Sequence, residues 1–316
     1  MRIIHALNTI KIYIKGYKMA LPIIKNASFS IKIKEFSKPI KIRPMILAEH
    51  KAIQAATDMN DDTDIATVIA DVTASCTDGI ISATSVPAYV LNFVFLQLYM
   101  NSVENIVQSR YTCYNIKKDE DGKNLIDEET GDEIKCNTSI DVNIPLSNAQ
   151  IEYPENFEDL KTVKITEDIY LVLKCLSLQQ NIEIQNLQYD IVNIIQNVNS
   201  LESINDETSA EDKKIYDDKI DHAAKEIQAI KNKIKDYYSY FSVDYIQDGQ
   251  TKLFPEKDFN HDEFIEWMNN CPSSSLLHSE KFYEKTPEIT MDLEVKCGEC
   301  GNKESIKLRG LKDFFS

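Results

Sequence analysis

The sequence predicts an α+β protein that is mostly α: a helical core with an N-terminal β-hairpin, a cysteine-bearing β-hairpin or zinc-ribbon-like element, and a projecting antiparallel coiled-coil hairpin. Three observations predict this class. Lysine-rich segments near the N-terminus alternate apolar and polar residues, a heptad-spaced stretch occupies the middle of the chain, and a Cys-x-x-Cys turn separates two strand-like segments near its end. With 316 residues, 43% of them hydrophobic and 27% charged, the chain can bury a sizeable core.

These changes of pattern divide the chain into five segments. We expect residues 1–18 to be a leader or upstream extension, because Lys11 and Lys15 interrupt them and they lack the cleavage site of a signal peptide. The others are residues 19–110 (β-hairpin plus helical bundle), 111–165 (cysteine-bearing β-hairpin region), 166–258 (helical region with the coiled-coil hairpin at 184–241) and 259–316 (C-terminal helices and the Cys-x-x-Cys β-element).

The N-terminal hairpin is predicted from residues 29–34 and 40–43, which both alternate apolar and lysine-rich positions with period two. Residues 1–45 hold ten Lys or Arg and one acid, Glu35, in a chain whose net charge is −16. A basic arm on an acidic protein suits docking against protein neighbours. The alternative is a solvated edge strand that its lysines protect from aggregation.

Three helices should follow the hairpin. Helical patterning begins at Met45 and resumes after Asp64, which is a candidate N-cap. Pro87 opens the third helix, which we expect to run to about Ser109. Together these helices predict a compact bundle.

Strand patterning replaces helical patterning after the bundle. Residues 111–116 and 133–144 are predicted strands on either side of an acidic loop, and this hairpin places Cys113 and Cys136 near its two bases. A further strand is expected near 162–165, followed by a helix over about 166–180.

The clearest periodicity lies in the predicted coiled coil, where apolar residues recur at alternating steps of three and four. A polar break separates its two halves, and Ser209 with Asp212 three residues later predicts the cap of the second helix. The alternative is a long helix pair inside an ordinary core. The seam residues are Ile184, Leu187, Ile191, Ile194, Val198 and Leu201, then Ile220, Ala223, Ile227, Ile230, Ile234, Tyr237 and Phe241.

The C-terminal segment begins with two short helices, one over 260–268 and one around 281–283. It then carries Cys297-Gly-Glu-Cys300 between two strands, which is half of a zinc site. Cys113 and Cys136 are the candidate partners, so the predicted metal ligands are Cys113, Cys136, Cys297 and Cys300 and the possible cofactor is a structural zinc. Two alternatives stay open: Cys297 and Cys300 with other ligands or redox chemistry, and no metal.

The sequence contains no pattern that is typical of an enzyme active site. The five histidines lack ligand spacing, and no nucleophile elbow, P-loop or dinucleotide fingerprint is present. We therefore predict no enzyme, with no catalytic or cofactor-binding residues and no small-molecule substrate. The acidic balance argues against nucleic-acid binding, and the longest apolar run, residues 86–100, is too short to span a membrane.

Three features together resemble a known family. Arg43-Pro44 is followed by Glu49-His-Lys51, a cysteine-bearing hairpin comes later, and the chain ends in Gly310-Leu-Lys-Asp-Phe-Phe315. This order is similar to the baseplate hub and hub-assembly proteins of T-even-type contractile-tail bacteriophages, over residues 19–144 and 259–316.

The resemblance implies a viral tail structural or assembly protein without catalysis. It would be a baseplate hub component or a hub-assembly factor that contacts other phage baseplate and tail proteins, in the virion tail baseplate or in the host cytoplasm during virion assembly. The alternative is a zinc-ribbon regulator that binds nucleic acid or the transcription machinery.

Overall fold

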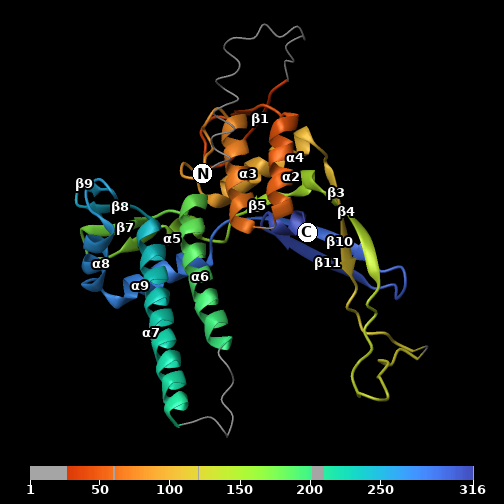
Figure 1. The fold of residues 1–316 in the computed structure, drawn as a ribbon. Helices are drawn as coiled ribbons and strands as arrows, with labels where there is room; N and C mark the ends of the chain where they lie inside the picture. The colour runs from red at the N-terminus through yellow and green to blue at the C-terminus, as the bar shows by residue number, and fades with distance from the viewer. Residues whose placement is uncertain (1–26, 60, 120, 201–209, 316) are drawn as a thin grey trace, which may run out of the picture. The chain divides into compact units, whose positions relative to one another are not determined.

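The computed structural model describes residues 27–59, 61–119, 121–200 and 210–315, which form eight α-helices and four antiparallel sheets (Figure 1). The predicted α+β class is therefore confirmed. Two compact units are distinguished, Met1–Pro44 and Met45–Ser316. The predicted leader, residues 1–18, and the cap at Ser209 lie outside the described residues, and the five-segment division stays a prediction.

The first unit contains the predicted N-terminal hairpin. Strand β1 (Phe29–Ile31) pairs with β2 (Ile40–Ile42), and Phe29 lies opposite Ile42. Ile40 and Ile42 are buried whereas Lys41 between them is exposed. The alternation of the sequence therefore sets which face of β2 is apolar.

The second unit begins with helices α2 (Leu47–Met59), α3 (Asp62–Cys76) and α4 (Ala88–Ser102). Helix α3 begins earlier than expected, because Asp61 is its N-cap and accepts hydrogen bonds from the backbone N–H groups of Thr63 and Asp64. The prediction of Asp64 as the cap was wrong. Both aspartates suit a helix start, and the first of them can reach the free N–H groups.

A buried carboxylate joins α2 to α3. Glu49 is only 6% exposed and accepts hydrogen bonds from the Ile46 backbone N–H at 2.9 Å and the Ser75 hydroxyl at 3.1 Å. The Cys76 thiol donates to the same carboxylate at 3.6 Å. Glu49 is thus a structural residue whose burial is compensated by several donors.

Helix α4 ends at Ser102, so the prediction of a helix to Ser109 was wrong. Strand β3 (Ile106–Thr112) follows and pairs with β4 (Ser139–Pro145). Along β3 the more buried positions alternate with exposed ones, which is the period of a strand. The first predicted strand, 111–116, therefore begins later in the sequence than β3. The second, 133–144, begins earlier than β4.

The region after β4 also differs from the prediction. The expected helix over 166–180 is absent, and β6 (Thr162–Lys164) is joined by a tight turn to β7 (Ile169–Leu173). Residues of β7 are β-branched, aromatic or leucine, and such a short apolar run fits a buried strand as well as a helix.

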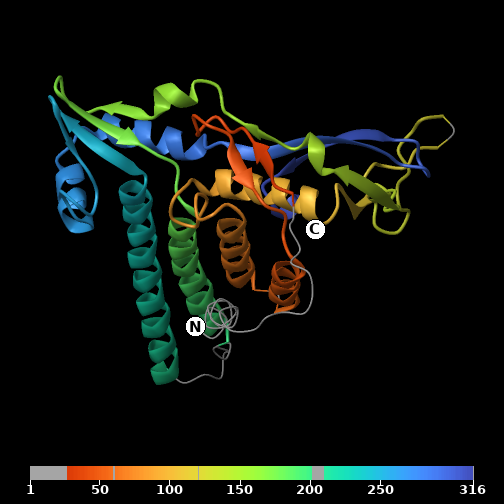
Figure 2. The ribbon, with the colours of Figure 1, turned by 90° about the horizontal axis from the view of Figure 1, so that it is seen from above.

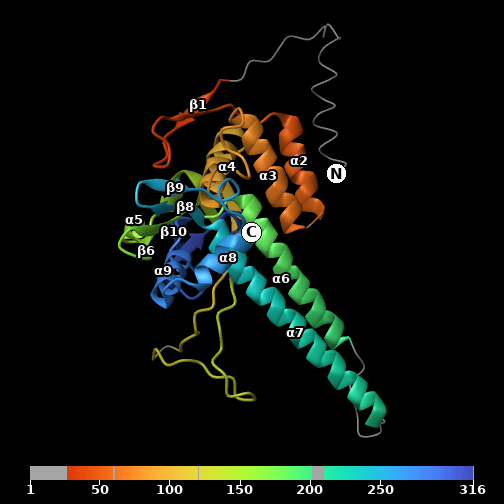
Figure 3. The same ribbon diagram turned by 90° about the vertical axis from the view of Figure 1, so that its left-hand side faces the viewer.

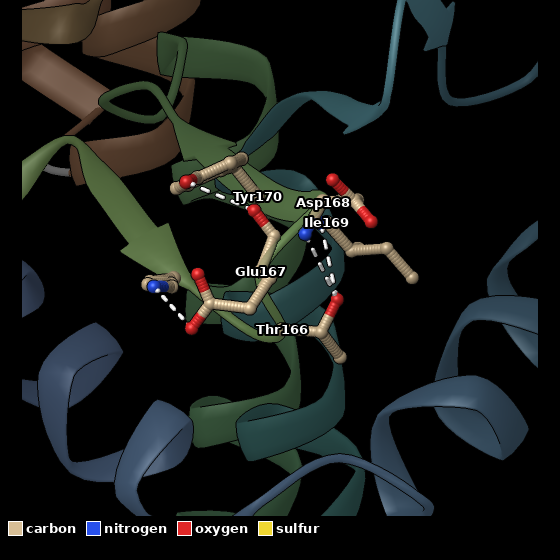
Figure 4. Close-up of polar contacts among 6 residues, drawn as sticks. Thr166, Glu167, Asp168, Ile169 and Tyr170 are labelled. Atoms are coloured by element: carbon tan, nitrogen blue, oxygen red, sulfur yellow. Dashed lines mark hydrogen bonds and ion pairs between the residues drawn. The ribbon is translucent and has the colours of Figure 1, made fainter.

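Figure 4 shows why the chain turns at this point. The Thr166 hydroxyl accepts hydrogen bonds from the backbone N–H groups of Ile169 at 3.1 Å and Asp168 at 3.4 Å. The Tyr170 hydroxyl donates to the Glu167 carbonyl at 3.2 Å, and the Glu167 carboxylate pairs with Lys164 at 2.9 Å. A threonine that binds nearby N–H groups in this way closes a turn instead of starting a helix.

Strands β6 and β7 belong to a four-stranded sheet with β8 (Val243–Asp248) and β9 (Thr251–Leu253). The β8–β9 hairpin was missed, although Asp248-Gly249 is a hairpin signal and Gly249 has a φ of +53°. Helices α5 (Phe157–Leu160), α8 (His261–Asn269) and α9 (Ser273–Glu284) contribute to the core of this sheet. That core contains Phe157, Val163, Leu171, Leu173, Tyr240, Val243, Ile246, Phe264 and Phe282.

Helix α8 confirms the short helix predicted over 260–268. Asn260 and Glu263 form its capping box, in which each side chain accepts a hydrogen bond from the other residue's backbone N–H. Helix α9 is longer than the short helix that was expected around 281–283.

Helices α6 (Leu178–Asn199) and α7 (Ala210–Phe241) lie side by side and run in opposite directions (Figures 1 and 3). Ser177 and Gln180 form a capping box at the start of α6. Among the described residues, the predicted seam positions are buried or half-buried except Ile220, which is 37% exposed. The helix pair is therefore present, and its supercoiling stays a prediction.

The C-terminal strands form the predicted strand–turn–strand. Strand β10 (Glu288–Lys296) pairs with β11 (Lys303–Arg309) on one side and with β5 (Gln150–Glu152) on the other. Figure 2 shows that β10 and β11 extend alongside the β3–β4 hairpin.

The last residues close a second core. Gly310 has a φ of +64° and its N–H donates to the Ile289 carbonyl, while the Asp313 carboxylate accepts from the Arg309 N–H at 2.9 Å. These bonds turn the chain into the short 3₁₀ helix η2 (Lys312–Phe314). Phe314 is fully buried there among Leu96, Ile144, Leu146, Ala149, Ile289 and Met291.

We predict that Phe314→Ala lowers the free energy of unfolding by about 3–5 kcal/mol, because it leaves a cavity in this core. The matched control is Phe315→Ala, since Phe315 is 38% exposed and rests its ring on Tyr99 with centroids 4.9 Å apart. Urea denaturation of both variants measures the difference. Equal losses would contradict the special role of Phe314.

Candidate metal centre

The first pair of cysteines lies just beyond the β3–β4 strands, where the two chains remain hydrogen-bonded. The Cys113 N–H donates to the Thr138 carbonyl, and the Asn137 N–H donates to the Cys113 carbonyl, both at 2.9 Å. The Cys136 N–H donates to the Asn115 carbonyl at 2.8 Å. This extension of the ladder holds Cys113 and Cys136 at fixed positions near each other.

The second pair lies in the turn between β10 and β11. The Cys297 N–H donates to the Asn302 carbonyl at 2.8 Å, and the Gly301 N–H donates to the Cys297 carbonyl at 3.1 Å. Gly301 has a φ of +71°, a conformation that glycine adopts without strain. The turn therefore brings Cys297 and Cys300 toward the same point.

The four thiols converge. Cys113 Sγ is 3.7 Å from Cys300 Sγ, Cys136 Sγ is 3.8 Å from Cys297 Sγ, and all four sulfur atoms lie within 4.8 Å of one another. A tetrahedral ion with Zn–S bonds of about 2.3 Å requires sulfur separations of about 3.8 Å. A disulfide requires about 2.05 Å, and all four residues are free cysteines. The spacing is thus that of a four-thiolate metal site.

Two polar side chains lie within hydrogen-bonding distance of the sulfur atoms. The Asn115 side-chain amide donates to Cys300 Sγ at 3.7 Å, and the Thr138 hydroxyl lies 3.1 Å from Cys136 Sγ. Donors of this kind orient metal-binding thiolates and stabilise their charge. Sequence reasoning missed both residues, although each is within two positions of a predicted ligand.

The environment of the thiols is asymmetric. The backbone N–H of Asn302 lowers the pKa of the Cys300 thiol, with a further contribution from Asn115. At Cys113 the backbone N–H of Asn115 also lowers the pKa, but burial and the neighbouring thiols of Cys300 and Cys297 together raise it to about 12. Cys300 is therefore the thiol most readily ionised of the two, and a bound cation would be needed to hold both as thiolates.

A hydrogen bond outside the cluster supports the same arrangement. The Tyr111 hydroxyl, on β3, donates to the Glu304 carboxylate, on β11, at 2.9 Å. Ile140 of β4 packs against the cysteines. The two hairpins are therefore also in contact beside the thiols, at the level of Tyr111 and Ile140.

The other cysteines lie elsewhere. Cys76 ends α3, and Cys175 and Cys271 are half-buried away from the cluster. Among the residues that the structure describes, no second group of three or more metal-ligating side chains is found. The Cys297–Cys300 pair also lies between two strands, whereas a thioredoxin-like redox pair sits at a helix N-terminus.

Comparison with known families identifies the chain. A family model described as T4 bacteriophage base plate protein matches residues 25–316. The chain belongs to this family. The match also covers residues 145–258, which the resemblance of the two end regions left out. No curated protein and no solved structure matches.

Membership makes the chain a bacteriophage baseplate structural protein of the virion tail, and the family implies interaction with other phage tail proteins. Within the described part of the chain, none of the helices is long and apolar enough to cross a membrane.

The geometry predicts selective cross-linking between distant segments. After treatment with a chelator, mild oxidation should form disulfides that join the peptide of Cys113 or Cys136 to the peptide of Cys297 or Cys300. Mass spectrometry of the digested protein identifies the pairs. Cross-links that instead use Cys76, Cys175 or Cys271 as often as these four would contradict the arrangement.

Proposed function

We propose that this baseplate protein is a component of the baseplate hub or a factor that assembles the hub, and that it acts through protein–protein interfaces without catalysis. The family match over residues 25–316 carries the proposal. The finer assignment to the hub is supported by the motif resemblance, in which Arg43-Pro44 with Glu49-His-Lys51 and the C-terminal Gly310-Leu-Lys-Asp-Phe-Phe315 occur together. If it acts only in assembly, its location is the host cytoplasm.

We further propose that Cys113, Cys136, Cys297 and Cys300 bind one structural zinc. The sulfur separations of 3.7 and 3.8 Å and the burial of three of the four thiols support this ligand set. The ion would complete a zinc-ribbon-like element from two hairpins and stabilise their association. Because the unfolded chain holds no such site, metal binding would contribute directly to folding stability.

Two surfaces are proposed as contacts with tail proteins. The β1–β2 hairpin exposes Lys32, Lys34, Lys38 and Lys41, so it suits an acidic neighbour. The α6–α7 pair, read as an antiparallel coiled-coil hairpin, presents a long helical surface. The four segments that follow the leader are then an interface hairpin with its bundle, a metal-holding centre in two parts, and a helical contact element.

We predict that the purified protein contains one equivalent of zinc per chain. Cys300→Ser should abolish stoichiometric zinc and lower the free energy of unfolding by several kcal/mol, because three ligands hold the ion poorly. Elemental analysis and thermal denaturation measure the two effects. The control is Cys271→Ser, outside the cluster, which should keep the zinc; an unchanged melting temperature of Cys300→Ser would refute the structural zinc.

The place of the protein in the phage can be decided by quantitative mass spectrometry of purified particles. A fixed stoichiometry with other baseplate proteins is expected for a hub component, whereas presence only in infected-cell extracts is expected for an assembly factor. Salt-sensitive binding of the purified protein to DNA or RNA would contradict both and favour a zinc-ribbon regulator.

A further inference from the structure

The second half of α6 exposes apolar side chains on a stretch that lacks charge. Residues 191–199 of α6 contain no charged side chain. Yet Val192 is 45% exposed, Ile195 is 44% exposed, and Tyr189 one turn earlier is 43% exposed. Single exposed apolar residues are ordinary, but two neighbouring ones on an uncharged stretch, with a third one turn earlier, indicate a surface that a partner covers.

Helical geometry places these residues on a defined flank. Val192 and Ile195 each follow a seam residue, Ile191 and Ile194. In an antiparallel pair, the positions that follow the seam residues of both helices lie on the same side. The flank of α6 that carries Val192 and Ile195 is therefore continuous with the corresponding flank of α7.

The α7 part of this flank has a symmetric charge pattern. Its exposed residues from Asp217 to Lys235 are two acids, two uncharged residues and two lysines. In order they are Asp217, Asp221, Ala224, Gln228, Lys231 and Lys235. Five of them follow the seam residues from Ile220 to Ile234, and Asp217 follows Tyr216, which continues the seam spacing four residues earlier. The next residue of the flank, Tyr238, is half-buried, so the exposed stripe ends at Lys235.

When a second copy of α7 is placed antiparallel to the first, with the two helices crossing at Glu226, the stripes of the two copies face each other. Asp217 then lies opposite Lys235, Asp221 opposite Lys231, and Ala224 opposite Gln228. None of the four charged side chains has an ion-pair partner among the residues that the structure describes. A two-fold symmetric contact requires that a surface be complementary to the same surface of a second copy running in the opposite direction. This stripe meets that requirement, because each acid faces a lysine of the second copy.

We propose that this flank binds the same flank of a second copy of the chain, in antiparallel orientation, to form a four-helix contact. The stripe from Asp217 to Lys235 spans about 27 Å at 1.5 Å per residue, which is ample for a helical interface. Small or uncharged residues lie at its centre, and the charges lie toward its ends.

The apolar residues of α6 lie close to that centre. Ile194 and Val198 line one groove together with Lys219 and Ala223 of α7, so these stretches lie at the same level. Val192, two residues before Ile194, is consequently near the level of Glu226. Burial of Val192 and Ile195 supplies the affinity, and the charged ends fix the antiparallel direction, since exposed ion pairs add more specificity than stability.

The proposal does not depend on the hub assignment and can be tested on the purified full-length chain. Sedimentation equilibrium over a concentration series should give the mass of two chains. Asp217→Lys with Asp221→Lys should give the mass of one chain, because four cations then face four cations across the axis. Lys231→Asp with Lys235→Asp should do the same with four acids.

Mixing the two double variants should restore the two-chain mass, and so should combining all four substitutions in one chain. The matched control, Lys219→Asp with Lys233→Asp, makes the same charge change on the opposite flank and should remain a dimer. Circular dichroism should show unchanged helicity in every variant.

A wild-type chain that stays monomeric, a failure of the mixture to associate, or equal dissociation of the control would overturn the proposal. A monomer that binds only another tail protein through this flank would likewise overturn it and assign the surface to that protein.

Discussion

The convergence of four thiols is the constraint that brings the β3–β4 hairpin and the β10–β11 strands together. Cys136 and Cys297 are 161 positions apart, and Cys113 and Cys300 are 187 apart, yet their sulfur atoms meet at 3.8 and 3.7 Å. One pair sits at the end of the two-stranded β3–β4 hairpin, and such hairpins are marginal in water by themselves. The other pair sits in the turn between two strands of the three-stranded sheet β11–β10–β5. Joining them produces a unit in which each hairpin restrains the other, and the loop-closure entropy of so long a separation is the main cost.

The C-terminal motif has a structural explanation of the same kind. Gly310 supplies a positive φ, Asp313 accepts the Arg309 N–H, and Phe314 fills a core built by α4, β10 and the segment after β4. Glu49, near the other end of the resemblance, is a buried acceptor between two helices. Each of these residues determines a local geometry that few other side chains can provide.

Sequence reasoning succeeded where the information is local and failed where it is not. Asn260 and Glu263 cap α8 within one turn, and the seam spacing is visible along α6 and α7, so both were predicted. Ile169–Leu173 was expected to be helical, because a short apolar run does not reveal the strands that pair with it. The four cysteines could be predicted as ligands from their positions in the sequence. The convergence of their sulfur atoms depends on the strand registers of two hairpins, which only long-range pairing determines.

The buried clusters and the α6–α7 pair therefore differ in how much of their surface is covered within the chain. The thiol cluster and the Phe314 core are built from buried groups. The α6–α7 flank is the reverse: fully buried α6 residues lie only in its first two turns, and the rest of the helix depends on a single seam. In a chain of net charge −16, nine consecutive residues without charge next to a palindromic charged stripe require a partner whose surface repeats the pattern in reverse. A second copy of the chain meets that requirement without any further component.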